Sequence, residues 1–306
     1  MPSPIIIGSR GSGLAMRQSE QIADALRDLL PDTEVRITAI HTTGDRITDA
    51  LLSRVGGKGL FTKEIEEALL AGDVALAVHS MKDLPTELPE GLCVGAVPER
   101  EEPHDVLISH EGQVLEELHA HAHVGTSSLR RAAQLRAYRK DLDVVPLRGN
   151  VDTRLRKVRE GEIDAAILAG AGLRRMGLAQ EITQQLSDSI MLPAPAQGAL
   201  AIEVREDNIA IRELLARLED ADSRTAVTAE RTFLASLEGG CQVPLGALAR
   251  REGEQLILDA CVCSLDGAHV LRCTAEGPYD RPEETGLRAA ELLRKQGADA
   301  LLDSLR

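Results

Sequence analysis

The sequence is almost free of aromatic residues. Among its 306 residues there are two Phe, two Tyr and no Trp, although hydrophobic residues make up 43% of the chain. The cores must therefore be aliphatic, and stacking of bases on aromatic side chains is poorly supported. The formal net charge of −14 repels polyanions at long range. We therefore expect neither a nucleic-acid partner nor general binding to anionic membranes.

Cysteine is scarce, and its spacing fits no disulfide framework. The cysteines are odd in number, contain no CxxC motif and follow no secretory segment at the start of the chain. This indicates a reducing compartment, and we predict a cytoplasmic protein. No apolar stretch approaches the length that crosses a bilayer, so no membrane partner is expected. The cysteines are Cys93, Cys241, Cys261, Cys263 and Cys273.

The chain is long enough for two or three domains, and most of it repeats one local pattern. An apolar run, a polar loop and an amphipathic helix follow one another over residues 4–31, and similar units recur up to about residue 177. Alternation of this kind builds mainly parallel sheets. From about Asp222 the pattern changes to a helix, short alternating strands and a last helix. That change predicts a small α+β domain with an antiparallel sheet.

Two proline-containing segments are candidate domain boundaries. AVPEREEPHD occupies residues 96–105 and MLPAPAQG occupies residues 191–198, and together they bracket a middle domain. The next segment, GALAIEV at residues 198–204, has the character of a strand that returns to the first domain. The chain would then cross twice between two domains, which predicts a hinge.

Polar motifs directly follow several of the apolar runs. In open α/β sheets, ligands bind outside the carboxyl ends of strands, where helix N-termini present backbone N–H groups. Residues placed there share one rim if their strands share a sheet, or face each other across a cleft between two sheets. The motifs are Arg10 and Ser12, His79 to Asp83, Thr126 to Arg131, and Arg148 to Arg154.

The segment from Arg130 to Arg159 is a basic island in an acidic protein, with ten Lys or Arg against three Asp or Glu. An Arg in the first turn of a helix opposes the helix dipole, and a bound anion would relieve that conflict. Several guanidinium groups together indicate a ligand with several carboxylates, or a phosphate. Two alternatives stay open: the helix faces are simply solvated, and the hydroxyls of residues 126–128 only cap a helix.

Lys82 and Asp83 stand at the end of a predicted strand. An Asp beside an ammonium group in a cleft can stay ionised, stabilise a developing cation and exchange protons with it. Asp-Leu-Pro is also an ordinary turn opener, and this alternative stays open.

Two further motifs are less informative. His119, His121 and His123 have the spacing of side chains on one face of a strand, but a connector is favoured over a metal site, and we expect no metal. GGKGLF lacks the GxxxxGK[ST] spacing of a phosphate loop, so we interpret it as a mobile loop that carries Lys58.

Cys241 lies between a Gly pair and a Val-Pro step at the predicted end of a helix. Nearby backbone N–H groups in a tight, exposed turn favour the thiolate. A Cys/His hydrolase would need an oriented imidazole, for which His79 is a weak candidate, and a covalent tether is the other option.

The motifs resemble those of the porphobilinogen deaminase (hydroxymethylbilane synthase) family from about residue 7 to residue 248. The resemblance implies an enzyme of tetrapyrrole synthesis that joins four porphobilinogen molecules head to tail, releases ammonia each time, and frees linear hydroxymethylbilane by hydrolysis. The alternative is a non-catalytic two-domain binding protein for a small polyanionic ligand. The motifs are GSRGSGLAMRQ, HTTGD, VGGKGLFTKEIE, AVHSMKDLP, VGTSSLRR, LRGNVDTRL, AGLRRMG, LPAPAQGALAIE and LEGGCQVPLGA.

The resemblance also implies an architecture. We expect an α/β protein with two domains like those of periplasmic binding proteins, with mainly parallel sheets, and a small α+β C-terminal domain, in a monomer. Combined with the boundaries above, the domains are residues 1–98 with 193–219, residues 99–192, and residues 220–306, the last carrying the cofactor cysteine. Arg54 stands where the family commonly has Lys, and Gly11 and Gly13 occupy positions that vary in the family.

The resemblance further implies roles for individual residues. Cys241 would hold a dipyrromethane cofactor through a thioether, and Asp83 would stabilise the azafulvenium cation left by ammonia loss. The residues expected to hold the cofactor are Cys241, Lys82, Asp83, Thr126, Ser127, Ser128, Arg130 and Arg131, and those expected to hold substrate or chain carboxylates are Arg10, Ser12, Lys58, Arg148, Arg154, Arg175 and Gln197.

Overall fold

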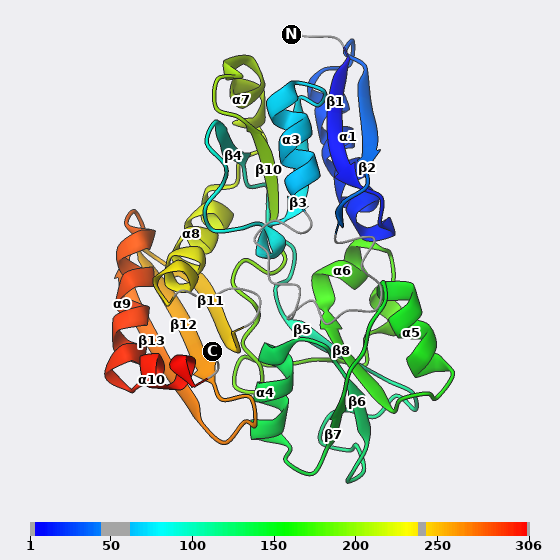
Figure 1. The fold of residues 1–306 in the computed structure, drawn as a ribbon, viewed down its shortest axis with the longest axis vertical. Helices are drawn as coiled ribbons and strands as arrows, with labels where there is room; N and C mark the ends of the chain where they lie inside the picture. The colour runs from blue at the N-terminus through cyan, green and yellow to red at the C-terminus, as the bar shows by residue number, and fades with distance from the viewer. Residues whose placement is uncertain (1–3, 44–61, 238–242, 305–306) are drawn as a thin grey trace. The chain divides into compact units, whose positions relative to one another are not determined.

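The computed structural model describes residues 4–43, 62–237 and 243–304 (Figure 1). Its contacts divide the chain into two units, one of Met1–Arg100 and Ala199–Arg224 and one of Glu101–Gly198 and Thr225–Arg306. Each unit is described by itself. Among the described residues there is no helix long and apolar enough to cross a membrane.

The first unit is built on a five-stranded sheet in the order β2-β1-β3-β10-β4. Strand β1 is parallel to β2 and β3, whereas β10 is antiparallel to β3 and β4. The strands are β1 (Ile5–Arg10), β2 (Val35–Ile40), β3 (Leu76–Ser80), β4 (Leu92–Ala96) and β10 (Leu200–Arg205). The helices are α1 (Gly13–Leu29), α3 (Lys63–Ala71), the short 3-10 turn η1 (Met81–Asp83) and α7 (Ile209–Leu215).

Helices cover both faces of this sheet because its strands are apolar on both sides. Ile5 and Ile7 of β1 pack in one core with Ile22 and Leu26 of α1. The intervening Ile6 points to the other face and packs in the core that contains α3. Residues two apart on a strand share a face, so this alternation places α1 and α3 on opposite sides.

The second unit contains a sheet in the order β7-β6-β8-β5-β9. Strand β6 is parallel to β7 and β8, and β5 is antiparallel to β8 and β9. Helix α4 packs on one face through Leu135, and α5 packs on the other through Leu155 and Val158. The strands are β5 (Asp105–Ser109), β6 (His123–Gly125), β7 (Asp143–Val145), β8 (Ala165–Ala169) and β9 (Gln184–Gln185); the helices are α4 (Leu129–Tyr138), α5 (Val151–Arg159), α6 (Gly170–Arg175) and the 3-10 turn η2 (Ala179–Glu181).

The same unit contains the antiparallel sheet β11-β12-β13. Phe233, one of the two Phe in the chain, is fully buried in the core between this sheet and its helices. The elements are α8 (Ala221–Ser236), which belongs to this unit from Thr225 on, β11 (Leu245–Glu252), β12 (Gln255–Cys263), β13 (Val270–Pro278), α9 (Pro282–Lys295) and α10 (Ala298–Asp303).

A buried amide joins the C-terminal sheet to helix α4. The Gln134 side chain donates to the Leu192 carbonyl (3.0 Å) and accepts from the Leu192 N–H (2.9 Å). Arg272 of β13 donates to the same Gln134 oxygen at 3.4 Å. Residues of α4 and β12 also meet in a small apolar cluster that contains Cys261 and Cys263.

The predicted α/β class, the mainly parallel sheets and the small antiparallel C-terminal domain are confirmed. Each of the two larger sheets is mixed, because one strand, β10 in the first and β5 in the second, runs against the other four. Strand β10 enters the first sheet, and β5 the second, from an extended segment without an intervening helix. A parallel connection needs a crossover, usually a helix, whereas these strands arrive antiparallel. Strand β10 is the segment that the sequence suggested would return to the first domain.

Candidate active site

The turn after β3 presents Asp83 on a well-anchored backbone. Met81 is buried, and its N–H donates to the Ala199 carbonyl at 3.0 Å. Gln18 of α1 donates to the Ser80 hydroxyl at 2.9 Å. Lys82 is half-buried and Asp83 is exposed. The strand end is thus held from two sides while the Asp83 side chain stays accessible.

Arg10 and Ser12 lie at the same edge of the first sheet as Asp83, because β1 and β3 are parallel neighbours. Arg10 ends β1 and is half-buried. The Ser12 hydroxyl accepts from the Ala15 N–H at 3.4 Å and caps α1. The prediction that these motifs share one rim is therefore confirmed for the first sheet.

The hydroxyls between β6 and α4 have partners within the chain. Ser128 caps α4 by accepting from the Arg131 N–H (3.4 Å), and its own N–H donates to the Thr126 hydroxyl (3.2 Å). The exposed Ser127 donates to the Leu147 carbonyl at 2.8 Å. The capping interpretation is therefore correct, and a role in binding stays a prediction.

Arg130 and Arg131 are almost fully buried, at 5% and 6% exposure, and both contact Asp105. Arg131 Nε donates to an Asp105 oxygen at 2.9 Å, and Arg130 also donates to the Leu192 carbonyl at 2.8 Å. Sequence reasoning missed Asp105, because it stands in a segment interpreted as a linker. Its carboxylate is an internal anion at the positive end of α4, and it relieves part of the conflict that suggested a bound one.

Arg148 and Arg154 lie beside this cluster, because β7 and β6 are parallel neighbours. The turn that carries them needs Gly149, whose φ is +107° and where an added Cβ would lie 2.7 Å from the Thr153 side chain. Arg154 donates to the Gly149 carbonyl at 2.8 Å. Its pKa is lowered by burial and by the positive charge of Arg131. Arg148 is half-buried.

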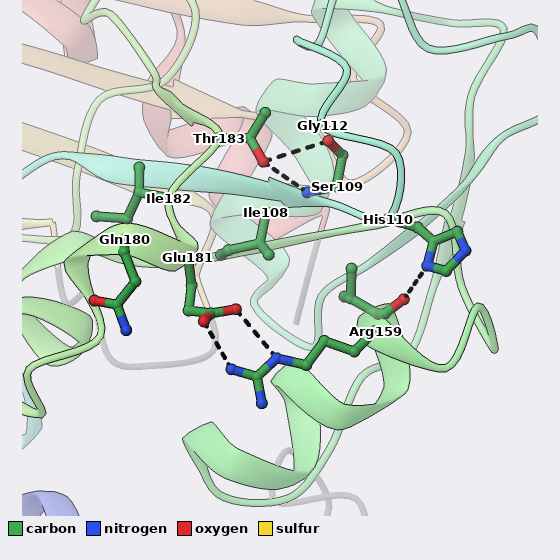
Figure 2. A pocket seen from close by; sticks show the side chains of 10 residues that line it. Ile108, Ser109, His110, Gly112, Arg159, Gln180, Glu181, Ile182 and Thr183 are labelled. Carbon is green, nitrogen blue, oxygen red and sulfur yellow. Dashed lines mark hydrogen bonds and ion pairs between the residues drawn. The ribbon is translucent and has the colours of Figure 1, made fainter.

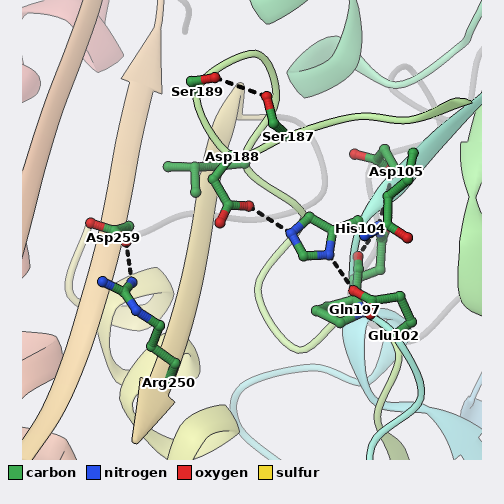
Figure 3. Close-up of polar contacts among 12 residues, drawn as sticks. Glu102, His104, Asp105, Ser187, Asp188, Ser189, Gln197, Arg250 and Asp259 are labelled. Atoms are coloured by element: carbon green, nitrogen blue, oxygen red, sulfur yellow. Dashed lines mark hydrogen bonds and ion pairs between the residues drawn. The ribbon is translucent and has the colours of Figure 1, made fainter. Parts of the chain in front are cut away.

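Arg175 and Gln197 lie at the end of the second unit where the chain crosses to the first. Arg175 donates to the Gly198 carbonyl at 2.6 Å, and burial lowers its pKa to about 10. Gln197 is buried, and its amide nitrogen donates to the Pro103 carbonyl (2.7 Å) and to Asp105 (2.9 Å; Figure 3).

His79 faces the core of the first unit. It is buried, and its Nε2 lies 3.0 Å from the carboxylate of the equally buried Glu203. An imidazole held in this way is not presented to the turn that carries Asp83, which weakens the hydrolase interpretation further. Cys241 and Lys58 lie outside the described residues.

Two of the three predicted connector histidines have acidic neighbours that the sequence did not indicate. His119 lies 3.5 Å from Asp164, and His121 lies 3.7 Å from Asp143. Within residues 4–43, 62–237 and 243–304, no three His, Cys, Asp or Glu side chains are grouped so that they could hold a metal ion.

A separate polar pocket lies at the opposite edge of the second sheet (Figure 2). Ser109 lines it and pairs with Ala165, the first residue of β8, whereas the arginine cluster lies at the carboxyl edge. The Arg159–Glu181 ion pair (2.7 Å) crosses this pocket. None of the residues that line this pocket is a predicted site residue.

Comparison with known proteins identifies the family of the chain. Residues 5–213 match the family model of the porphobilinogen deaminase dipyromethane cofactor binding domain, and residues 224–295 match that of the porphobilinogen deaminase C-terminal domain. The chain belongs to the porphobilinogen deaminase family. The resemblance inferred from the motifs is confirmed, and so is the cofactor class.

Curated relatives match along their whole length. The chain is 52% identical to the porphobilinogen deaminase of Desulforudis audaxviator over 306 residues, which cover all of this chain and 99% of the relative. It is also 52% identical to that of Pelotomaculum thermopropionicum, of which it covers 98%. Among solved structures, it is similar to the periplasmic aliphatic sulphonate binding protein SsuA of Escherichia coli, with 14% identity, a TM-score of 0.41, and 78% and 71% of the two chains covered.

Family membership establishes the activity. The protein is a transferase of tetrapyrrole biosynthesis with porphobilinogen deaminase (hydroxymethylbilane synthase) activity and a dipyrromethane cofactor domain. The family implies porphobilinogen as the substrate. A purely ligand-binding role is thereby set aside.

Proposed function

We propose that the arginine cluster of the second unit, formed by Arg130, Arg131, Arg148 and Arg154, binds the acid side chains of the cofactor and of the growing chain. We also propose that Asp83 is the catalytic residue. The observation that supports this most is the charge balance of the cluster. Asp105 offsets only one of the three positive charges of Arg130, Arg131 and Arg154. Arg131 lies close enough to Arg154 to lower the pKa of Arg154. A surplus of positive charge in a largely buried site favours carboxylate ligands.

The donor chemistry of these residues fits a dipyrromethane. Each pyrrole brings an acetate and a propionate, and guanidinium groups match carboxylates with two parallel hydrogen bonds. When bound, the dipyrromethane supplies the nucleophilic pyrrole carbon to which the first substrate is joined. The residues proposed to hold it are Lys82, Asp83, Thr126, Ser127, Ser128, Arg130 and Arg131, and those proposed for substrate or chain carboxylates are Arg10, Ser12, Lys58, Arg148, Arg154 and Arg175. Gln197, which was expected in the second group, is buried and donates to Asp105.

Asp83 acts on the substrate cation. Loss of ammonia from porphobilinogen leaves positive charge on the pyrrole, and a fixed carboxylate beside it stabilises that charge as it develops. The Asp83 carboxylate also accepts and returns the protons that leave and rejoin the pyrrole nitrogen and carbon. The contacts at Ser80 and Met81 support this role, because they hold the turn without covering the carboxylate.

Cys241 anchors the cofactor through a thioether in this proposal, in keeping with the Gly-Gly-Cys-Gln-Val-Pro motif of the family.

We also propose a cytoplasmic monomer. The described cysteines are free, which suits a reducing compartment. Size-exclusion chromatography with light scattering tests the monomer, and a mass near twice the 32.9 kDa of the chain would contradict it.

Intact mass spectrometry tests the proposed site directly. The purified protein should exceed its sequence mass by two pyrrole units, and the surplus should map to a peptide that contains Cys241. Asp83→Asn should keep the surplus mass while turnover collapses, whereas Arg131→Ala should lose the surplus. An active enzyme with the bare sequence mass would reject the tether.

A further inference from the structure

Asp105 is the carboxylate on which the buried arginines converge. It is the first residue of β5, it is completely buried, and it contacts both Arg130 and Arg131. Burial alone would raise its pKa, but the two guanidinium groups outweigh that effect and hold the pKa well below its usual range. Asp105 is therefore ionised at neutral pH.

One oxygen of Asp105 joins an arginine to the chain crossover. Its Oδ1 accepts from Arg131 Nε at 2.9 Å. It also accepts from Gln197 Nε2 at 2.9 Å (Figure 3). The same Gln197 nitrogen donates to the Pro103 carbonyl at 2.7 Å. A shift of Gln197 therefore changes the hydrogen bonding of the oxygen that orients the Arg131 guanidinium.

The crossover around Gln197 is itself tightly constrained. Ala196 has a φ of +61°, which a residue with a side chain adopts only when its surroundings enforce it. Its N–H donates to the buried carboxylate of Glu230 at 2.5 Å. The Gly198 carbonyl accepts from the Glu101 N–H at 3.2 Å and from Arg175. The chain passes between the units after residue 100 and after residue 198. Both of these places are therefore next in sequence to residues that make the hydrogen bonds described above.

We propose that Asp105 and Gln197 are positioning residues for carboxylate recognition. Asp105 fixes the guanidinium planes of Arg130 and Arg131 and limits their mutual repulsion, and Gln197 ties this arrangement to the two crossover segments. Gln197 then acts through Asp105 and not by touching the substrate. The inference rests on the proposed cofactor-binding role of Arg130 and Arg131.

The test compares cofactor loading, read as the ratio of loaded to bare chains by intact mass. Asp105→Asn keeps the size of the side chain and removes its charge, and we expect the ratio to fall about fivefold or more. Asp105→Glu, which restores the charge, should recover part of the loss. Leu115→Ala is the matched control, because Leu115 is fully buried in the same domain and outside the network. It should lower stability and leave loading unchanged.

A double-mutant cycle separates the routes by which Gln197 could act. Gln197→Leu and Arg131→Lys should each lower loading, and the double variant should load no worse than the poorer single variant, because both changes act on the same Asp105 oxygen. Losses that multiply would show independent contacts and overturn the inference. Gln197→Leu keeps every charge, so it decides the question alone if Asp105→Asn does not fold.

Two outcomes distinguish this inference from the function on which it rests. If Asp105→Asn loads fully and has the wild-type KM for porphobilinogen while Arg131→Ala does not load, the positioning role is wrong and the cofactor site stands. If Arg130→Ala and Arg131→Ala both load fully, the proposed cofactor site itself is wrong.

Discussion

His104 should make the stability of the second unit depend on pH. Its ring lies between two carboxylates, with Nε2 2.9 Å from Asp188 and Nδ1 bonded to Glu102 (Figure 3). The hydrogen bond to Asp188, helped by Glu102 and opposed by burial, raises the pKa of His104 from 6.5 to about 9. A pKa raised on folding means that the protonated form stabilises the native state.

The size of the effect follows from the shift. A change from 6.5 to about 9 corresponds to about 3 kcal/mol at about 1.4 kcal/mol for each pH unit. Asp188 and Glu102 are 41% and 35% exposed, so solvent screening reduces this to about 1–2 kcal/mol. The contribution is fully present below pH 6.5 and is lost as the pH rises through about 9.

Urea unfolding of the wild type and of His104→Gln at pH 6 and pH 9.5 measures this contribution. Circular dichroism is the suitable probe, because the chain has no Trp. The variant should be less stable by about 1–2 kcal/mol at pH 6, and the difference should shrink at pH 9.5. His269→Gln, at an exposed residue outside this cluster, should show no such trend. A difference for His104→Gln that is the same at both pH values would refute the reasoning.

Three further predictions concern the site. Asp83→Asn should lower kcat by about a thousandfold or more in steady-state assays, because the developing cation loses its fixed counter-charge; near-normal turnover would remove Asp83 from the mechanism. Cys241→Ser should purify at the bare sequence mass, and a surplus of two pyrrole units on that variant would place the tether elsewhere. Gly149→Ala should lower the free energy of unfolding by about 1–2 kcal/mol, since φ is +107° and the new Cβ meets Thr153; an unchanged urea midpoint would contradict that backbone requirement.

Local patterns in the sequence predicted the elements that carry the site. Apolar runs followed by a polar loop and a helical pattern predicted α1, α4 and α5, and the hydroxyls of residues 126–128 indicated the start of α4. The family motifs then supplied the chemistry of residues such as Asp83. The mixed order of the sheets was not predictable in this way, because it depends on pairing between strands far apart in sequence, such as β3 with β10.

Asp105 illustrates what local reasoning cannot find. It stands beside Pro103 and several acidic residues, a composition typical of an exposed linker, yet it begins a buried strand. Its partners Arg131 and Gln197 lie 26 and 92 residues away. A cluster of arginines without a nearby acid could have prompted the search, because buried guanidinium groups need partners.

The chain as a whole is acidic, whereas its candidate site is basic, and the two charges differ in how strongly solvent screens them. A net charge of −14 is spread over exposed side chains, where water and salt screen it. Arg130 and Arg131 are buried, so each charge there acts at short range in a poorly screened environment, and Asp105 contacts both of them. Adding one carboxylate there would reduce the surplus that carboxylate ligands need, whereas removing Asp105 would leave neighbouring guanidinium groups to repel each other. A single buried acid therefore supports both the stability of the cluster and its capacity for an acidic ligand.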